Sequence, residues 1–364
     1  MNVLLCLSHA IEEYDQLQLL HGLGYNVASI GGYIDPSHPH TDSRPALPAI
    51  PMVPEIKAAV DGLGTFDNLG AAQGRLPDAV LEWADVIIYH HYLDRLYGQW
   101  DRIRAWRAAR SDRRVIWRTV GQSVEHNEEQ AQAYRADGLE IVRYSPRERA
   151  IPGFAGEDAL IRFYKDPDEW YGWTGHVSAV INFTQHLAQR DPYTNFGFWD
   201  GATRDLPRIP MGPGSEPIGG TGAQSYDEMR QALRDHRAYL YTGTQPASYT
   251  LGLIEAMMTG IPVVSITPDF MRVFPYGPDL FEGMDIVEFG SLPVSVVGSL
   301  AQVVLNTHEM LSDLLRFDER AANHSRAMRS RAIELFGIAT IGPQWQSYLG
   351  TPSRAVLAPV GASA

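Results

Sequence analysis

The sequence predicts an α/β protein built from two doubly wound halves. Its 364 residues exceed what one ordinary hydrophobic core accommodates, so two domains are expected. Short apolar runs typical of buried strands alternate with segments of helical spacing, which favours parallel sheets. The alternation stops in an irregular stretch rich in Gly and Pro, residues 150–175, and starts again at Val177.

The first half opens as a βαβ unit. The apolar run 2–7 predicts a buried strand, residues 10–23 a helix that ends at Gly24, and residues 27–30 a second strand. No G-x-G-x-x-G follows the first strand, so a nicotinamide or flavin dinucleotide site of the usual kind is not expected. The later strands of this half are predicted at 86–89, 113–119 and 139–144, and the later helices at 93–110 and 130–136.

The second half repeats the alternation of strands and helices. It ends in a tail of Ala, Pro, Ser and Gly that has too little apolar content to fold alone. Its strands are predicted at 177–183, 208–211, 238–241 and 261–266. Its helices are predicted at 226–234, 250–259, 300–315, 319–335 and 343–349.

The overall charge is acidic. The formal net charge of −13 excludes a surface that is positive throughout, and with it indiscriminate binding to nucleic acid. Arginine carries nearly all of the positive charge, because Lys57 and Lys165 are the only lysines. Any anion-binding role therefore falls largely to arginine, whose planar guanidinium suits phosphate.

Several features predict a soluble cytoplasmic protein without membrane insertion. The single cysteine, Cys6, lies in the first apolar run and cannot form an internal disulfide, which suits a reducing compartment. The N-terminal run lacks a basic region and a cleavage site, so no signal peptide is expected, and no stretch approaches the roughly 18 apolar residues of a membrane helix. His38 and His40 have no third ligand at a suitable spacing, so no metal site is predicted.

The segment 239–264 carries the most specific pattern. A buried strand ends in a loop of small and polar residues, and Thr250 then caps a helix. The first turn of this helix offers backbone N–H groups, which form an anion site together with the positive end of the helix dipole. Glu255 lies one turn further, where its carboxylate can accept hydrogen bonds from vicinal hydroxyls. Gly260 ends the helix before the next buried strand.

This segment resembles the donor-site signature of retaining glycosyltransferase family 4, whose members have the GT-B fold of two Rossmann-like domains facing across a cleft. The signature reads E-G-F-G-x-x-x-x-E-A-M-A-x-G-x-P-V-V. The residues that match it in register are Glu255-Ala256-Met257, Gly260 and Pro262-Val263-Val264. Weaker matches cover Pro210–Gly214, Ser225–Leu233 and Trp345–Leu349.

The resemblance implies a glycosyltransferase that moves a sugar from a nucleotide-sugar to an unidentified acceptor. It also implies retention of configuration, a UDP-sugar as the favoured donor, and no metal or cofactor. Glu255 would bind the ribose, and the backbone of 248–251 would face the diphosphate and sugar. Arg190 is the first candidate for a basic clamp on the diphosphate. The expected donor-binding residues are Lys165 (second candidate for the clamp), Gly243, Thr244, Ser248, Tyr249, Thr250, Leu251 and Glu255.

Polar residues that end strands of the first half are candidates for the acceptor side, because open α/β sheets bind ligands at the carboxyl ends of their strands. These candidates are Ser8, His9, His90 and Gln122. The residues expected to act in catalysis are Arg190, Glu255 and His9.

The same interpretation divides the chain into five parts. They are an acceptor domain at 1–152, a connection at 153–175, a nucleotide-sugar donor domain at 176–338, a terminal helix at 339–350 that crosses back to the first domain, and a flexible tail at 351–364.

Three positions depart from the family pattern. Ala247 stands where the first glutamate of the E-x7-E pair falls, Ser8-His9 replace a Gly-rich loop, and Gly121-Gln122 occupy the place of an expected histidine. Ala247 and the missing histidine keep open a catalytically silent nucleotide-sugar binding protein. An epimerase with the same fold is a further alternative.

The segment Arg102–Arg118 contains seven arginines and allows two interpretations. One is a solvated helix face. The other is a phosphate-contacting patch, which keeps open a DNA glycosyltransferase that acts on a hydroxymethylated pyrimidine base and binds DNA through this segment.

Overall fold

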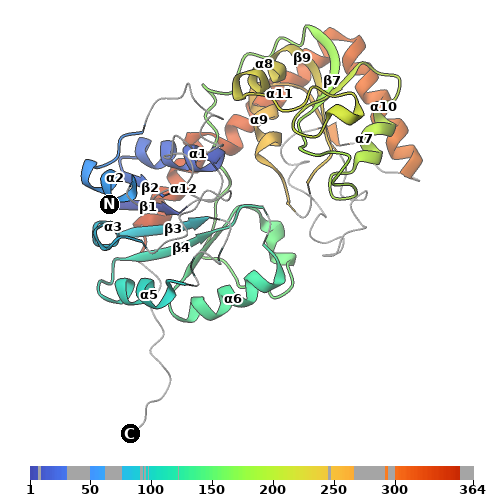
Figure 1. The fold of residues 1–364 in the computed structure, drawn as a ribbon. Coiled ribbons are helices and arrows are strands. Elements are labelled where there is room, and N and C mark those ends of the chain that lie inside the picture. Colours follow the sequence, from blue (N-terminus) through green and yellow to red (C-terminus); the bar gives the residue numbers. More distant parts are fainter. Residues whose placement is uncertain are drawn as a thin grey trace. The chain divides into compact units, whose positions relative to one another are not determined.

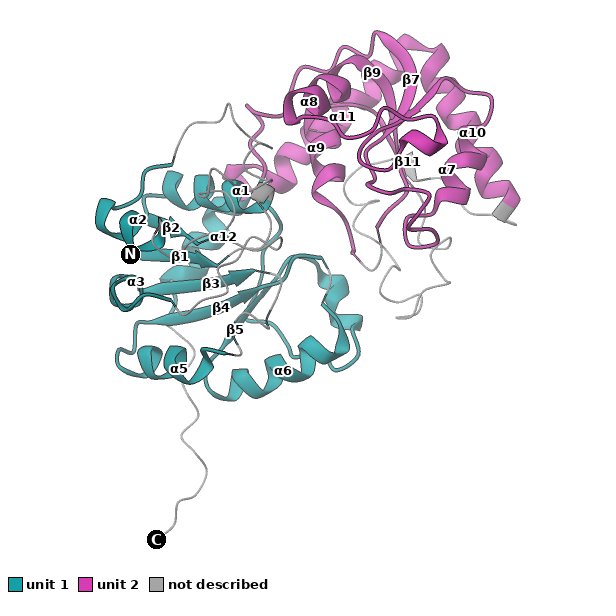
Figure 2. Cartoon of the chain, in the orientation of Figure 1, with its two compact units in different colours: residues 1–164, 341–364 teal, residues 165–340 magenta. Residues whose placement is uncertain are grey.

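The computed structural model describes the chain outside residues 7–9, 31–49, 62–75, 91–92, 94–95, 97, 122, 245–246, 266–291, 294–299 and 353–364. Structural statements concern the described residues. The chain forms two compact units (Figure 2), unit 1 from Met1–Tyr164 and Ile341–Ala364, and unit 2 from Lys165–Thr340. The first division falls inside the segment expected to be the connection, and the second falls near the start of the expected terminal helix.

Unit 1 is built around a parallel sheet (Figure 1) with the strand order β2-β1-β3-β4-β5-β6. Its strands are β1 Asn2–Cys6, β2 Asn26–Ser29, β3 Val86–His90, β4 Arg114–Arg118, β5 Glu140–Arg143 and β6 Ala159–Leu160. Its helices are α1 Ala10–Gly22, α2 Pro54–Asp61, α3 Asp78–Trp83, α5 Trp100–Ala108, α6 Glu125–Ala136, the short η3 Pro146–Ala150, and most of α12 Ile338–Gly350.

Apolar residues cover both faces of this sheet. Successive residues of a strand point to opposite faces, so neighbours in β3 join different clusters. In β3, Ile87 and Tyr89 join one apolar cluster together with buried residues of α2, α3, α5 and α6. Val86 and Ile88 join the opposite cluster, which contains residues of α1 and α12. The nearly continuous apolar character of the strands therefore follows from burial on two faces.

Polar contacts also hold α12 on unit 1. The Arg114 guanidinium forms a buried ion pair with Glu140 and donates to the Tyr348 carbonyl at 2.7 Å. The same guanidinium lies 4.3 Å from the centroid of the Tyr348 ring, and the Tyr348 hydroxyl donates to Glu140 Oε2 at 2.8 Å. Trp345 of the same helix is completely buried. Helix α12, from the far end of the sequence, therefore covers part of one face of the unit 1 sheet.

Unit 2 contains a second parallel sheet, with the strand order β11-β10-β9-β7-β8. Its strands are β7 Val177–Asn182, β8 Arg208–Pro210, β9 His236–Tyr241, β10 Val263–Ser265 and β11 Leu292–Pro293. Its helices are α7 Phe196–Ala202, the short η4 Glu216–Ile218, α8 Tyr226–Asp235, α9 Leu251–Thr259, α10 Leu300–Arg316 and α11 Asp318–Phe336.

The observed elements confirm the predicted α/β class with parallel sheets. Several differences concern helices, because α2 and α3 were not predicted and α6 begins at Glu125, earlier than expected. The helix predicted at 93–110 begins only at Trp100. Helix α7, which begins at Phe196 after a left-handed Asn195, was not predicted.

Replacement of Trp345 by Ala is expected to lower the free energy of unfolding by about 3–5 kcal/mol, because the indole is completely buried and its removal leaves a cavity. Urea denaturation followed by circular dichroism measures this change. The exposed neighbour Gln344 provides the control, and its replacement by Ala is expected to change the value by less than about 0.5 kcal/mol. Equal effects of the two substitutions would contradict the packing of α12 on unit 1.

Candidate functional site

The loops that follow β7, β8 and β9 meet at one edge of the unit 2 sheet. These strands are parallel neighbours, so their carboxyl ends lie together. The amide of His186, in the loop after β7, donates to the Pro213 carbonyl in the loop after β8 at 2.7 Å. At the end of the same loop, Asn195 Nδ2 donates to the Thr242 carbonyl after β9 at 2.8 Å. Hydrogen bonds therefore join the three loops into one surface.

Two residues of this surface have a backbone conformation that non-glycine residues rarely adopt. His186 has φ 53° and Asn195 has φ 55°, both in the left-handed region. Such a residue costs about 1–3 kcal/mol and persists where surrounding contacts fix it, which is common at binding sites. The loop after β7 is thus held in a defined shape, and it carries Arg190.

The start of α9 presents backbone N–H groups beside this surface. Thr250 has an extended backbone, and its Oγ1 accepts a hydrogen bond from the Leu253 amide at 3.3 Å. No described residue accepts a hydrogen bond from the amides of Leu251 and Gly252. Thr250, Leu251 and Gly252 are half-buried, so the first turn is partly exposed, and such helix starts bind anions through their amides. The preceding Ser248 and Tyr249, also expected at the donor site, are buried.

Glu255, one turn into α9, is paired with Lys165. Lys165 Nζ lies 2.5 Å from Glu255 Oε1, and both side chains are almost completely buried. The ammonium also lies 5.4 Å from the centroid of the Trp170 ring. No described residue donates to the second carboxylate oxygen, Oε2. The structure thus brings together two residues that the sequence analysis assigned separately to ribose and diphosphate.

The remaining unit 2 candidates lie on the same sheet edge. Arg190 is half-buried, and its Nη1 donates to the Gln185 carbonyl at 3.4 Å. Gly243 has φ 78°, which suits the sharp turn after β9, and Thr244 is half-buried. Their positions are compatible with a shared site.

Only one of the four acceptor-side candidates is described. Ser8, His9 and Gln122 lie outside the described residues. His90 ends β3 and is buried, with its Nε2 3.7 Å from Glu12 Oε1 of α1. The structure thus places one buried imidazole beside a buried carboxylate at the carboxyl edge of the unit 1 sheet.

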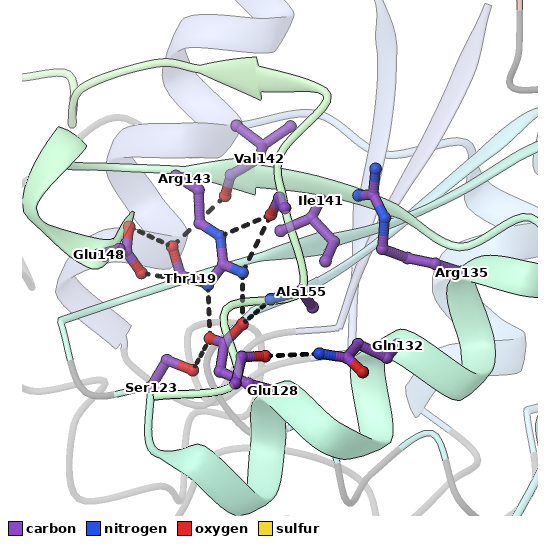
Figure 3. Close-up of polar contacts among 12 residues, drawn as sticks. Thr119, Ser123, Glu128, Gln132, Arg135, Ile141, Val142, Arg143, Glu148 and Ala155 are labelled. Atoms are coloured by element: carbon purple, nitrogen blue, oxygen red, sulfur yellow. Dashed lines mark hydrogen bonds and ion pairs between the residues drawn. The ribbon is translucent and has the colours of Figure 1, made fainter. Parts of the chain in front are cut away.

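A buried ionic network at the same edge was not found by the sequence analysis (Figure 3). Arg143, the last residue of β5, donates to both carboxylate oxygens of Glu128 in α6 at 2.7 and 2.6 Å, and both side chains are completely buried. Such a bidentate pair fixes the direction of both side chains. Its residues lie 15 apart in the sequence, and no local pattern indicates the pairing.

Two carboxylates of this network bind residues on either side of position 122. Thr119 Oγ1 donates to Glu148 Oε2 at 2.9 Å, and Ser123 Oγ donates to Glu128 Oε1 (Figure 3). Glu148 Oε1 lies 3.6 Å from Arg143 Nη1, so the same arginine contacts both carboxylates. Thr119 and Ser123 are therefore each held by a buried carboxylate.

Burial raises the pKa of Glu148 above its ordinary value, although Arg143 and three hydrogen-bond donors act in the opposite direction. A carboxyl whose pKa is raised by folding contributes stability below its unfolded pKa, near 4.5, and this contribution is lost as the pH rises through the folded pKa. Glu148 therefore contributes less to the stability of the folded protein at neutral pH than at acidic pH.

The arginines of the segment Arg102–Arg118 do not form an exposed basic patch. Four of them are buried, namely Arg107, Arg113, Arg114 and Arg118. The other three pair with carboxylates, Arg102 with Asp78, Arg104 with Asp101 and Asp137, and Arg110 with Asp85 and Asp112. A phosphate-binding face needs several uncompensated cations on one side. These contacts count against the interpretation of the segment as a phosphate-contacting patch.

Other features bear on ligands and surroundings. No group of three or more His, Cys, Asp or Glu residues converges in the described part of the chain in a way that could hold a metal ion. Cys6 is buried, and burial raises the pKa of its thiol. The helices that the structure describes are all too short or too polar to cross a bilayer.

Comparisons with solved structures show similarity along nearly the whole chain. Alr3699/HepE from Anabaena, solved with UDP and glucose, is 12% identical with a TM-score of 0.63, and the match covers 96% of this chain and 99% of that one. A glycosyltransferase from Rickettsia africae ESF-5 is 11% identical with a TM-score of 0.62, covering 96% and 97% of the two chains.

A third structure is an alpha-glucosyltransferase in complex with UDP and a 13-mer DNA containing an HMU base. It is 9% identical with a TM-score of 0.61, and the match covers 96% of this chain and 100% of that one. No family model and no curated protein matched the sequence. At such low identity the similarity shows the fold alone, which is GT-B with two Rossmann-like domains. The predicted fold class is confirmed, while the assignment to family 4 stays a prediction.

Replacement of Glu148 by Gln removes the titrating group. The free energy of unfolding of the variant, relative to that of the unaltered protein, is expected to rise as the pH increases from 4 to 7. Each unit by which folding raises the pKa contributes about 1.4 kcal/mol to this rise. Denaturant titrations over this pH range measure the difference, and a relative stability that falls with pH would show that the carboxylate is stabilised by its neighbours instead.

Proposed function

We propose that the protein is a glycosyltransferase that binds a UDP-sugar in unit 2 and transfers the sugar to an acceptor bound by unit 1. The observation that carries this proposal is the half-buried first turn of α9, where no described residue accepts from the Leu251 and Gly252 amides. Backbone amides at a helix N-terminus bind phosphate groups. Glu255 adds a carboxylate one turn away, and the similar Anabaena structure contains UDP.

The proposed roles follow from the chemistry of each group. The amides of the first turn of α9 and the Arg190 guanidinium bind the diphosphate and stabilise the negative charge that develops on it as the sugar departs. Glu255 accepts hydrogen bonds from the ribose hydroxyls through Oε2. Because the amides and Arg190 stabilise the leaving group, the proposed reaction proceeds without a metal ion. Retention of configuration follows from the resemblance to family 4.

On the acceptor side we propose a site at the carboxyl edge of the unit 1 sheet. His90 borders it, and Gln122 lies in the sequence between Thr119 and Ser123, which the carboxylates of the Arg143 network bind. Ser8 and His9 follow β1, which neighbours β3 in the sheet, and His9 is the proposed catalytic histidine. We also place the protein in the cytoplasm, an assignment that rests on its single buried thiol.

Glu255→Ala is expected to weaken UDP binding by about 10-fold or more, because hydrogen bonds to a charged group are worth about 1.5–3 kcal/mol. Isothermal titration calorimetry with UDP measures the affinity, and release of glucose from UDP-glucose measures activity with and without EDTA. Glu309→Ala, which removes an exposed carboxylate of α10, is the control and is expected to bind UDP normally. Absence of UDP binding by the unaltered protein would refute the proposal.

A second candidate function is glucosylation of a hydroxymethylated pyrimidine in DNA. It is favoured by the similarity in fold to the alpha-glucosyltransferase solved with DNA, and the acidic net charge argues against it. The pairing of the arginines outside the core with carboxylates counts against Arg102–Arg118 as the surface for this function. Transfer of labelled glucose from UDP-glucose to hydroxymethylated duplex DNA, but not to unmodified DNA, would distinguish it from the first function.

A third candidate is a nucleotide-sugar binding protein without catalysis, which is favoured by Ala247 in place of a glutamate. It predicts UDP-sugar binding with neither hydrolysis nor transfer. An epimerase would convert the donor without releasing UDP, so nuclear magnetic resonance of the donor distinguishes it from both.

A further inference from the structure

The ion pair between Lys165 and Glu255 joins residues that lie 90 apart in the sequence. Lys165 is one of two lysines in the chain, and its side chain has no exposed surface. Moving two charges out of water is costly, and apolar side chains of similar volume often stabilise a protein as well as a buried ion pair does. Stability alone therefore does not account for this buried pair, which indicates a functional reason for the two charges.

The segment that carries Lys165 is attached to α11 and, through Arg329 of α11, to the last turn of α9. The Lys165 amide donates to the Phe336 carbonyl at 3.0 Å. Arg329 of α11 donates to the carbonyl of Met258 in the last turn of α9, and its other amino group donates to the Pro167 carbonyl at 3.0 Å. The backbone beside Lys165 is thereby fixed relative to the helix that carries Glu255.

The two carboxylate oxygens of Glu255 have different surroundings. Oε1 is held by the Lys165 ammonium, and Oε2 has no donor among the described residues. A completely buried ammonium that is engaged in this way is badly placed to clamp a diphosphate, which was its expected role. Its position suits control of the direction of the Glu255 side chain.

We propose that Lys165 is a positioning residue that holds Glu255 so that Oε2 faces the ribose hydroxyls of the nucleotide. This inference rests on the proposed function, since it assumes that Glu255 binds the ribose. Without the ammonium, the carboxylate loses the contact that fixes its direction, and recognition of the hydroxyls weakens while diphosphate binding persists. The signature is therefore a loss of discrimination between nucleotides with and without ribose hydroxyls.

The test compares the affinities of the full-length protein for UDP and for 2′,3′-dideoxy-UDP by isothermal titration calorimetry. The unaltered protein is expected to prefer UDP by roughly 10- to 100-fold, the range of hydrogen bonds to a charged acceptor. Lys165→Met and Glu255→Gln are each expected to reduce this preference to about 3-fold or less, and the double variant to reduce it no further than either alone. Lys57→Met, which changes the only other lysine, is the control.

Loss of folding is separated from loss of positioning by the ratio of the two affinities. If Lys165 is purely structural, its replacement lowers the melting temperature and weakens the binding of both ligands equally. An unchanged preference for UDP in folded Lys165→Met therefore overturns the inference. If Lys165→Met does not fold, Lys165→Gln replaces it, because its amide can still donate, and a preference reduced to between 3- and 10-fold is then expected. An unchanged preference in Lys165→Gln also overturns the inference. Failure of the unaltered protein to bind UDP instead overturns the proposed function.

Discussion

The unsatisfied backbone amides at the start of α9 are the feature on which the proposed function depends. A helix leaves its first N–H groups without partners, and the Thr250 side chain accepts from only one of them. The amides of Leu251 and Gly252 have no acceptor among the described residues, and both residues are half-buried. Parallel strands bring the loops after β7 and β8 to the same edge, so a diphosphate at the helix could also meet Arg190.

The two units use buried charge for a common purpose. In unit 2, Lys165 holds one oxygen of Glu255 beside the proposed anion site. In unit 1, Arg143 holds Glu128, and this carboxylate accepts a hydrogen bond from the Ser123 hydroxyl in the loop after β4. Neither pair is an efficient source of stability, because desolvation offsets most of the attraction. Their common effect is to fix side chains and loops at the carboxyl edges of the two sheets, where ligands bind in this class of fold.

Local sequence patterns predicted much of the fold, and long-range pairing was beyond them. Apolar runs and helical spacing located most strands and helices, and the segment around Thr250 and Gly260 indicated a capped helix that the structure contains. Helix α7 was missed because its sequence, Phe-Gly-Phe-Trp-Asp-Gly-Ala, contains two glycines. The Lys165–Glu255 pair was invisible because tertiary packing sets it. Arginine spacing in 102–118 suggested a surface patch because the sequence does not reveal which guanidinium groups face the core.

A crystal structure of the protein with UDP tests the central claim most directly. The account predicts diphosphate oxygens about 2.7–3.1 Å from the amide nitrogens of Leu251 or Gly252, with the ribose hydroxyls beside Glu255 Oε2. Density for the nucleotide at another place, with the first turn of α9 contacting only water or protein, would contradict it.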